Sequence, residues 1–148
     1  MNPKFRAYDG SLNRMYQPEE VMAGNGDIWI HDEDFDVGEW AVNNDLNLMQ
    51  STGLFDKNGQ EIFEGDIITT SAYGCIVGFG EYTYFEDENT PTTEIGFYLS
   101  FLNVKPATYA PFDKYYWDNC EVIGNIYENE LDLILYEAHK YNKSKEKE

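Results

Sequence analysis

Basic residues are scarce in this chain, which has ten lysines and arginines against 28 aspartates and glutamates and a formal net charge of −18. The stretch from Met15 to His139 holds three basic and 25 acidic residues, a formal charge of −22. Nucleic-acid affinity comes mostly from basic side chains that neutralise phosphates, and anionic membranes attract the same side chains. The composition therefore argues against direct binding to nucleic acid or to a membrane.

The chain also has few cysteines and no long apolar run. No run approaches the roughly 20 residues of a membrane-spanning helix, and residues 1–4 lead into a strand pattern without a signal-peptide core. Cys75 and Cys120 are far apart in the sequence, and neither belongs to a C-x-x-C pair. We therefore expect a cytoplasmic protein in which both cysteines are reduced core residues.

Catalytic patterns are missing as well. His31 lies in an acidic run and His139 near the end of a predicted helix, and neither has a nucleophile beside it. No serine stands in a nucleophile elbow, and no glycine-rich loop opens a helix. We expect no catalytic residue and no cofactor. An unrecognised enzyme stays an alternative, because neighbouring carboxylates such as Glu64 and Asp66 can do acid–base chemistry.

One acidic run contains the pattern closest to a metal site. Asp32, Asp34 and Asp36 stand at positions 1, 3 and 5 of a calcium loop, where alternating oxygens can converge on one cation. The glycine expected at position 6 is Val37, however, and the glutamate expected at position 12 is Asn43. We therefore interpret the run as a solvated acidic loop and expect no metal, with these three aspartates as the candidate ligands.

The clearest local pattern covers residues 48–68, LMQSTGLFDKNGQEIFEGDII. Two apolar pieces flank a DKNG turn, in which Asn58 and Gly59 suit the positive-φ positions of a tight hairpin. Two β-favouring pairs follow, separated by a segment with Gly65, at which the chain can bend. The pattern predicts a strand, a turn, a strand, a corner and a further strand.

Other patterns predict a mostly-β fold. Strands are expected at residues 4–8, 13–17, 28–30, 74–79, 81–85, 95–104 and 121–127, with a short helical turn at 17–22. In residues 95–104 the alternation places Ile95, Phe97, Leu99 and Phe101 on one face. Residues 105–119, with two prolines and five aromatics, are expected to form a long loop.

These elements predict two parts. Residues 1–47 would form an N-terminal β subdomain with a β-hairpin, and residues 48–148 an SH3-like β subdomain, since bent strands joined by tight turns are typical of small SH3-like barrels and sandwiches. A continuous single domain is the alternative. One C-terminal helix of about a dozen residues should follow Asn129, because residues 131–138 place apolar side chains at helical spacing.

Three blocks of sequence carry a resemblance to a known family. They are Phe5-Arg6-Ala7-Tyr8-Asp9, then Thr52-Gly53-Leu54 with Asp56-Lys57-Asn58-Gly59, Glu61-Ile62 and Glu64-Gly65-Asp66-Ile67, and last Glu121-Val122-Ile123-Gly124-Asn125-Ile126-Tyr127-Glu128-Asn129. In this order they resemble the YopX family, which is encoded by phages and prophages. The resemblance implies a mostly-β fold and a phage or prophage origin, and it implies no activity.

Aromatic residues make up 16% of the chain, and many fall in expected loops and edges, including Tyr82, Tyr84 and Phe85. In residues 109–117 they stand beside only two charged residues, which is the composition of an interface core. The protein-contact candidates are Tyr109, Phe112, Tyr115, Tyr116 and Trp117. We expect a non-catalytic accessory protein that binds an unknown host or phage protein or forms a homo-oligomer. The alternative is an acidic decoy that imitates nucleic acid to occupy a nucleic-acid-binding protein.

Overall fold

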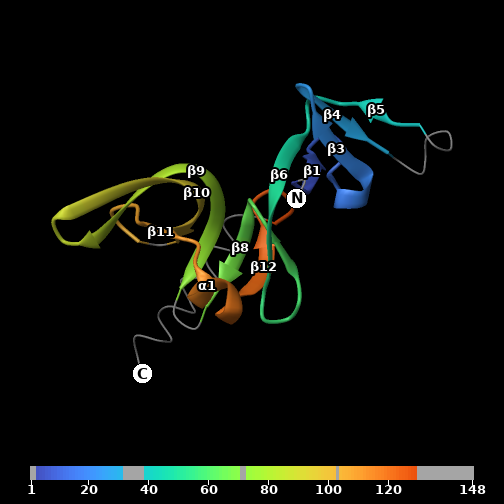
Figure 1. Cartoon of the computed structure of the whole chain (residues 1–148). Helices are drawn as coiled ribbons and strands as arrows, with labels where there is room; N and C mark the ends of the chain where they lie inside the picture. The colour runs from blue at the N-terminus through green and yellow to red at the C-terminus, as the bar shows by residue number, and fades with distance from the viewer. Residues whose placement is uncertain (1–2, 32–38, 71–72, 103, 130–148) are drawn as a thin grey trace. The chain divides into compact units, whose positions relative to one another are not determined.

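A computed structural model of the chain describes residues 3–31, 39–70, 73–102 and 104–129. Strands dominate the described ranges, which confirms the mostly-β prediction (Figure 1). The chain divides into two compact units, Met1–Ser51 and Thr52–Glu148. The division lies within strand β6 (Asn47–Phe55).

The first unit contains a hairpin and a small antiparallel sheet. Its elements are β1 (Phe5–Asp9), β2 (Arg14–Tyr16), the 3-10 turn η1 (Pro18–Glu20), β3 (Val21–Gly24), β4 (Asp27–Ile30), β5 (Ala41–Val42) and the start of β6. β1 pairs with β2 and β6, while β3, β4 and β5 form a separate sheet. Ala7, Tyr16 and Ile30 lie in its buried core. The hairpin and the short helical turn agree with the sequence patterns.

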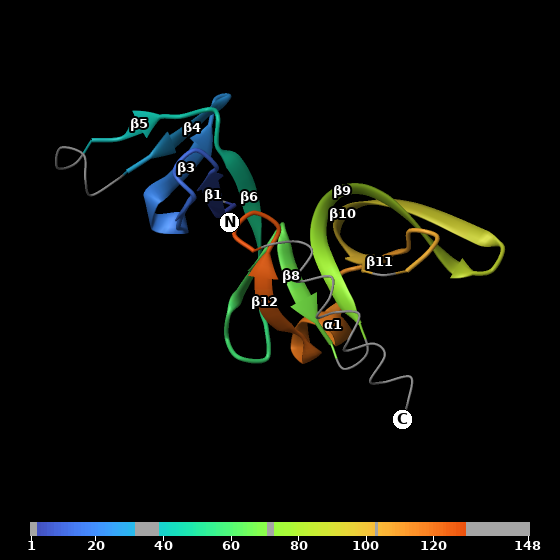
Figure 2. The ribbon, with the colours of Figure 1, turned by 180° about the vertical axis from the view of Figure 1, so that it is seen from behind.

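The second unit is built on a five-stranded antiparallel sheet. Its elements after β6 are β7 (Glu61–Phe63), β8 (Asp66–Thr69), β9 (Gly74–Asp87), β10 (Thr90–Phe101), β11 (Tyr109–Pro111), α1 (Lys114–Asn119) and β12 (Glu121–Asn125). The strand order is β11-β10-β9-β8-β12, and β9 curves strongly (Figure 2). Ile62, Ile68, Val77 and Leu99 belong to the buried core.

The longest feature of the second unit is the β9–β10 hairpin, whose register runs from Phe101 opposite Cys75 to Thr90 opposite Asp87. Its inner end belongs to the sheet, and its outer end reaches well beyond α1 (Figure 1). Gly80 stands opposite Gly96, so the hairpin lacks side chains at one level, where it can bend. We refer to the outer part, residues 79–97, as the arm.

The turn in the DKNG segment forms as predicted, with one difference. Gly59 has φ of 83°, whereas Asn58 is not among the described residues with positive φ. Asp56 accounts for this, because one of its carboxylate oxygens accepts hydrogen bonds from the Asn58 and Gln60 backbone N–H groups at 2.8 Å each. The bend at Gly65 also forms, with φ of 87°.

Residues 105–119 contain regular structure where the sequence predicted a loop. Tyr109–Pro111 pairs with the inner end of β10, a long-range contact that no local pattern reveals. Asp113 then begins α1, because its side chain accepts a hydrogen bond from the Tyr115 backbone N–H at 3.1 Å. The predicted helix after Asn129 lies outside the described residues. The specific SH3-like arrangement stays a prediction.

The two cysteines are buried and free. Burial is the largest influence on both thiols, and it raises the pKa of Cys75 to about 12 and that of Cys120 to about 11. Both side chains belong to the core of the second unit. This confirms the expectation of reduced core cysteines.

Candidate functional site

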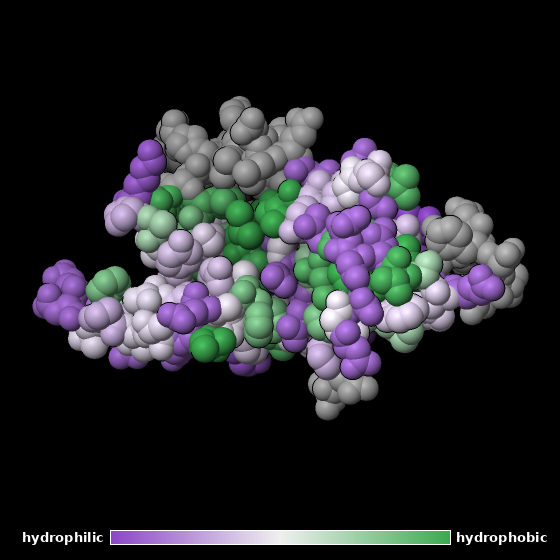
Figure 3. Space-filling view, turned by 90° about the horizontal axis from the view of Figure 1, so that it is seen from above, coloured by the Kyte–Doolittle hydropathy of each residue, from purple (hydrophilic) through white to green (hydrophobic). Residues whose placement is uncertain are grey.

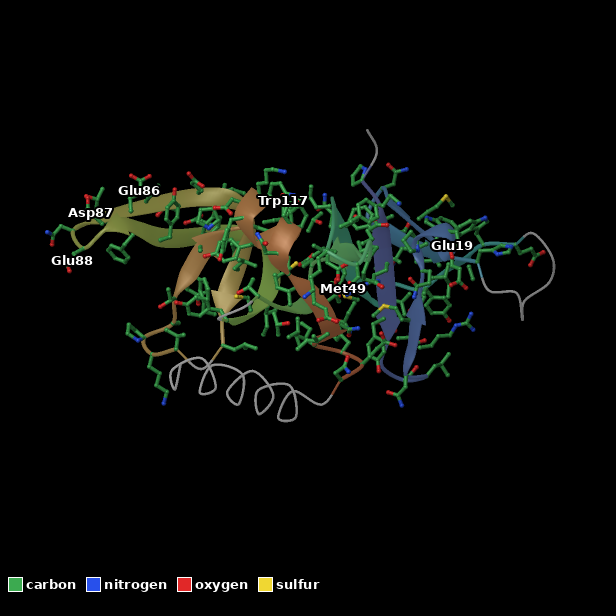
Figure 4. The ribbon with its side chains drawn as sticks, turned by 90° about the horizontal axis from the view of Figure 1, so that it is seen from below. Glu19, Met49, Glu86, Asp87, Glu88 and Trp117 are labelled. Atoms are coloured by element: carbon green, nitrogen blue, oxygen red, sulfur yellow. The ribbon has the colours of Figure 1, made fainter. Side chains whose placement is uncertain are left out.

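Three of the five aromatic residues predicted to contact a partner pack against the core of the second unit. Phe112, Tyr116 and Trp117 are half-buried there, and the rings of Phe112 and Trp117 meet edge to face with centroids 5.8 Å apart. Trp117 projects from α1 in Figure 4. These side chains therefore contribute to the fold, whether or not they also meet a partner.

The other two contact candidates lie in different places. Tyr115 on α1 is 61% exposed and free to meet another molecule. Tyr109 begins β11, where its ring meets that of Tyr98 nearly perpendicularly, with centroids 5.7 Å apart. The structure thus brings Tyr109 to a cluster of tyrosines on the arm and β10.

This cluster, the tyrosine face, consists of Tyr82, Tyr84, Tyr98 and Tyr109. The Tyr82 ring stacks on Tyr98 with centroids 5.1 Å apart and on Tyr84 with centroids 5.8 Å apart. Tyr98 lies across from Gly78, and a Cβ atom there would stand 2.4 Å from the Tyr98 ring. The glycine therefore leaves the space that the ring occupies, a pairing known to support strands that contain glycine.

Glu94 holds the outer end of the tyrosine face together. One of its carboxylate oxygens accepts a hydrogen bond from the Tyr82 hydroxyl at 3.0 Å, and the other accepts one from the Tyr84 hydroxyl at 3.2 Å. Burial, followed by the Glu94 carboxylate, raises the pKa of Tyr82 to about 12 and also raises that of Tyr84. Both phenols are therefore uncharged at physiological pH.

A groove of about 310 Å³ opens beside the tyrosine face. It is lined by Glu81, Tyr82, Thr83, Tyr98 and Tyr109. Three of these five residues are tyrosines, which come from the antiparallel strands β9, β10 and β11. Sequence reasoning noticed Tyr82 and Tyr84 but missed Tyr98 and Glu94, because only the strand register brings these side chains together.

The opposite face of the arm exposes large apolar side chains. Phe79 is 44% exposed, Phe85 63% and Ile95 77%, although Phe79 contacts the Phe97 ring with centroids 4.7 Å apart. Alternate residues of β10 share one face of the strand, as predicted, but they differ in how far they are buried. Leu99 is fully buried, whereas Ile95 lies in solvent.

The arm is also acidic. Residues 73–104 contain five carboxylates, at positions 81, 86, 87, 88 and 94, and no lysine or arginine. Glu86, Asp87 and Glu88 form the tip of the arm in Figure 4, and the same end is coloured as hydrophilic in Figure 3. Hydrogen bonds from the Asn89 backbone and the Thr90 hydroxyl lower the pKa of Asp87. The arm therefore stays negatively charged at neutral pH.

Away from the arm, the polar residues of the YopX-like blocks hydrogen-bond to the backbone. The second oxygen of Asp56 accepts from the Val122 backbone N–H at 2.9 Å, which joins the DKNG turn to β12. Asp66 is 1% exposed and accepts from the Phe63 backbone N–H at 2.7 Å. Gly65 donates to the Val77 carbonyl and accepts from the Ile126 N–H. These contacts fix the corner between strands.

The last block closes on itself in the same way. The Asn125 side-chain oxygen accepts from the backbone N–H groups of Tyr127 and Glu128, at 3.0 and 2.8 Å. The Asn129 side chain accepts from the Asn125 N–H at 3.0 Å and lies so close to Gly124 that a Cβ there would be 2.5 Å from its oxygen. These polar residues of the second and third blocks therefore stabilise turns and corners.

Residues 4–132 match the family model described as YopX protein, a range that contains all three blocks. The chain belongs to the YopX family. It is also similar to the crystal structure of protein EF1440 from Enterococcus faecalis, with 26% sequence identity, 90% of this chain and 99% of that chain covered, and a TM-score of 0.54. No curated protein matches the sequence.

Two further expectations concern metals and membranes. Among the described residues, no cluster of three or more His, Cys, Asp or Glu could hold a metal ion, while Asp32, Asp34 and Asp36 lie outside the described ranges. Within those ranges, no helix has the length and apolar character that crossing a membrane requires.

Proposed function

We propose that this YopX protein is a non-catalytic phage or prophage accessory protein that binds a host or phage protein through its arm. The exposure of the arm's apolar side chains carries the proposal. Ile95 and Phe85 are the most exposed of these side chains, at 77% and 63%. Apolar groups exposed together on one projecting element are typical of protein-binding surfaces, whereas a residue that only fills a core is covered.

Several carboxylates and both thiols of the second unit contact other groups of the protein or are buried, which supports a non-catalytic role. The carboxylates of Asp56 and Asp66 accept backbone hydrogen bonds in turns, and the Glu94 carboxylate accepts from two phenols. The two thiols are buried, with pKa values raised far above neutrality. An enzyme would need such groups in contact with its substrate.

Site-specific photocrosslinking tests the arm as the contact surface. p-Benzoylphenylalanine replaces Phe85 in one variant and Leu12 in a control, since both native side chains are apolar and more than 60% exposed. The full-length variants are irradiated in a lysate of the cells that encode the chain. We expect a discrete adduct of one protein at position 85 and none at position 12. Equal labelling at both positions, or none at 85, would contradict the proposal.

The charge of the chain supports a second candidate, the acidic decoy. A formal charge of −22 between residues 15 and 139 would attract a nucleic-acid-binding protein through its basic surface. Duplex DNA added before irradiation separates the two candidates. A decoy's partner should lose its adduct as DNA occupies the same basic surface, whereas a partner that is bound mainly through apolar contacts should keep it.

A further inference from the structure

We propose that the outer part of β9 binds an extended, basic segment of the partner protein, which adds to the arm as a further strand. This inference rests on the proposed protein-binding function and names the way in which the partner is bound. It depends on the direction of the backbone groups of β9, on the side chains beside them and on the charge of the arm.

The backbone groups of a strand in an antiparallel sheet point alternately to its two sides. At the inner end of the hairpin, the Val77 carbonyl points toward β8 and accepts a hydrogen bond from the Gly65 N–H at 2.7 Å. The Gly74 carbonyl points toward β10 and accepts from the Leu102 N–H at 2.8 Å. The register with β10 is regular from residue 75 to residue 85 of β9. Odd-numbered residues of the arm on β9 therefore point their N–H and C=O groups away from β10.

Four residues present these backbone groups along one line, which we call the β9 edge: Phe79, Glu81, Thr83 and Phe85. β8 pairs in register only with residues 74–76 of β9. Among the described residues, no strand continues the sheet beside the β9 edge. A strand edge with free N–H and C=O groups is the surface to which extended peptides add in β-augmentation.

The opposite edge of the arm is less suited to a further strand. On that side the Phe97 carbonyl already accepts a hydrogen bond from the Phe112 N–H at 3.3 Å, and β11 pairs with residues 98–100. Pro91 lies on the same side by alternation and has no N–H to donate. Proline is one of the residues that protect sheet edges from pairing. The β9 edge, in contrast, has a backbone N–H at all four outward positions.

The side chains along the β9 edge fit a segment that combines apolar and basic residues. Phe79, Glu81, Thr83 and Phe85 are all exposed, on the face of the arm that also exposes Ile95. An added strand places every second side chain on this face. Apolar side chains of the segment would pack beside the two phenylalanines, and a lysine or arginine opposite Glu81 would form a cross-strand pair of opposite charges.

The charge of the arm distinguishes a basic partner from a second copy of the chain. The arm has carboxylates at positions 81, 86, 87, 88 and 94, and residues 73–104 contain no lysine or arginine. Three of these carboxylates form the tip (Figure 4). A basic segment is attracted to such a surface, which speeds its association. A second copy would place two acidic arms side by side, and like charges on neighbouring strands are destabilising.

Amide hydrogen exchange of the full-length chain tests the β9 edge without any partner. We expect fast exchange at Glu81, Thr83 and Phe85, because their N–H groups point to solvent. Exchange should be at least about tenfold slower at Tyr82 and Tyr84, because their N–H groups point to β10. Uniform exchange along residues 81–85 would overturn the inference.

A synthetic peptide tests the chemistry of the occupant. The probe has about eleven residues, with lysine at the centre and at both ends and alternating valine and threonine between them, so that the valines share a face with the central lysine. The control has glutamate in place of every lysine. On titration into the full-length chain, we expect saturable chemical shifts and slowed exchange at Glu81, Thr83 and Phe85, and binding at least about threefold weaker for the acidic control. Equal binding of the two peptides, or no saturable shift with the basic one, would overturn the inference.

Two proline variants locate the peptide on one side of the arm. Thr83 and Thr93 are cross-strand partners whose Oγ1 atoms lie 2.8 Å apart. The Thr83 N–H points outward from β9 and the Thr93 N–H outward from β10, so each substitution removes one outward donor and the same contact between hydroxyls. Thr83→Pro should weaken the basic peptide at least about fivefold, whereas Thr93→Pro should change binding less than about twofold. Equal effects would overturn the β9 edge as the site, and the exchange pattern of the unaltered chain tests the edge even if a variant does not fold.

Two further outcomes separate the inference from its alternatives. Concentration-dependent shifts at the β9 edge without peptide, abolished by Thr83→Pro, would overturn it in favour of a second copy. In the photocrosslinking experiment, loss of the adduct at position 85 in Thr83→Pro but not in Thr93→Pro would support strand addition. An adduct that persists in both variants would leave the protein-binding function and overturn only the strand addition.

Discussion

The inner and outer ends of the β9–β10 hairpin have the same antiparallel strand pairing, but their side chains differ in burial. At the inner end, Leu99 is fully buried, and Asp66 and Asn125 hold neighbouring turns through backbone hydrogen bonds. At the outer end, four residues along the same face of β10, Ile95 is 77% exposed. The residues of the three sequence blocks and the exposed residues of the arm are therefore different sets. The family match covers both sets and does not distinguish them.

Leu99 and Ile95 lie on the same face of β10 at the two ends. Substitutions there should give the largest difference in the loss of stability. Leu99→Thr removes a fully buried side chain and buries a hydroxyl, so it should lower the free energy of unfolding by about 3 kcal/mol. Ile95→Thr keeps a β-branched residue at an exposed position and should change it by less than about 0.5 kcal/mol. Urea unfolding measures both. Similar losses at the two positions would mean that the arm is packed as tightly as the sheet.

Removal of the turn carboxylate tests the inner end in a second way. Asp56→Ala leaves the backbone N–H groups of Asn58, Gln60 and Val122 without their acceptor. We expect a loss of about 2–3 kcal/mol, because three part-buried hydrogen bonds lose their charged acceptor.

The control for this change is Asp118→Ala, which removes a carboxylate whose ion pair with Lys114 is exposed to solvent. Such pairs contribute at most about 1 kcal/mol. If urea unfolding gives the two aspartate variants the same stability, the hydrogen bonds of Asp56 do not hold the turn.

The sequence predicted the features that depend on neighbouring residues and missed those that depend on contacts between strands. The DKNG turn, the bend at Gly65 and the strand that contains Leu99 all follow from residue types that favour those conformations. The pairing of β11 with β10 depends on residues about ten positions away, and the groove needs Glu81, Tyr98 and Tyr109 from three strands. Local patterns carry no information on which strands are neighbours, so the alternation in β10 could not show that its outer half is uncovered.

Self-association through α1 would make this helix a further contact surface, besides the arm. Tyr115 is 61% exposed, whereas Trp117 packs on the core, so Tyr115→Ala tests contact with less risk to folding than Trp117→Ala. If copies associate here, added salt should strengthen assembly, because it screens the repulsion between acidic chains over about 8 Å near physiological strength. Tyr115→Ala should weaken assembly about threefold. Light scattering that shows a monomer at both low and high salt would exclude the homo-oligomer.

The smallest expected effect is a change in the pH titration of the tyrosine face. Burial and then the Glu94 carboxylate raise the Tyr82 pKa from 10.0 to about 12. The folded chain thus keeps a proton that the unfolded chain releases first, so this contribution to stability is complete below pH 10 and is lost as the pH rises toward 12. Glu94→Gln should move the late part of the tyrosine absorbance titration at 295 nm to lower pH, without abolishing the shift that burial causes. Glu88→Gln removes the same charge at the tip of the arm and should leave the curve unchanged. An unaltered titration in Glu94→Gln would mean that the phenol hydrogen bonds to Glu94 do not persist in solution.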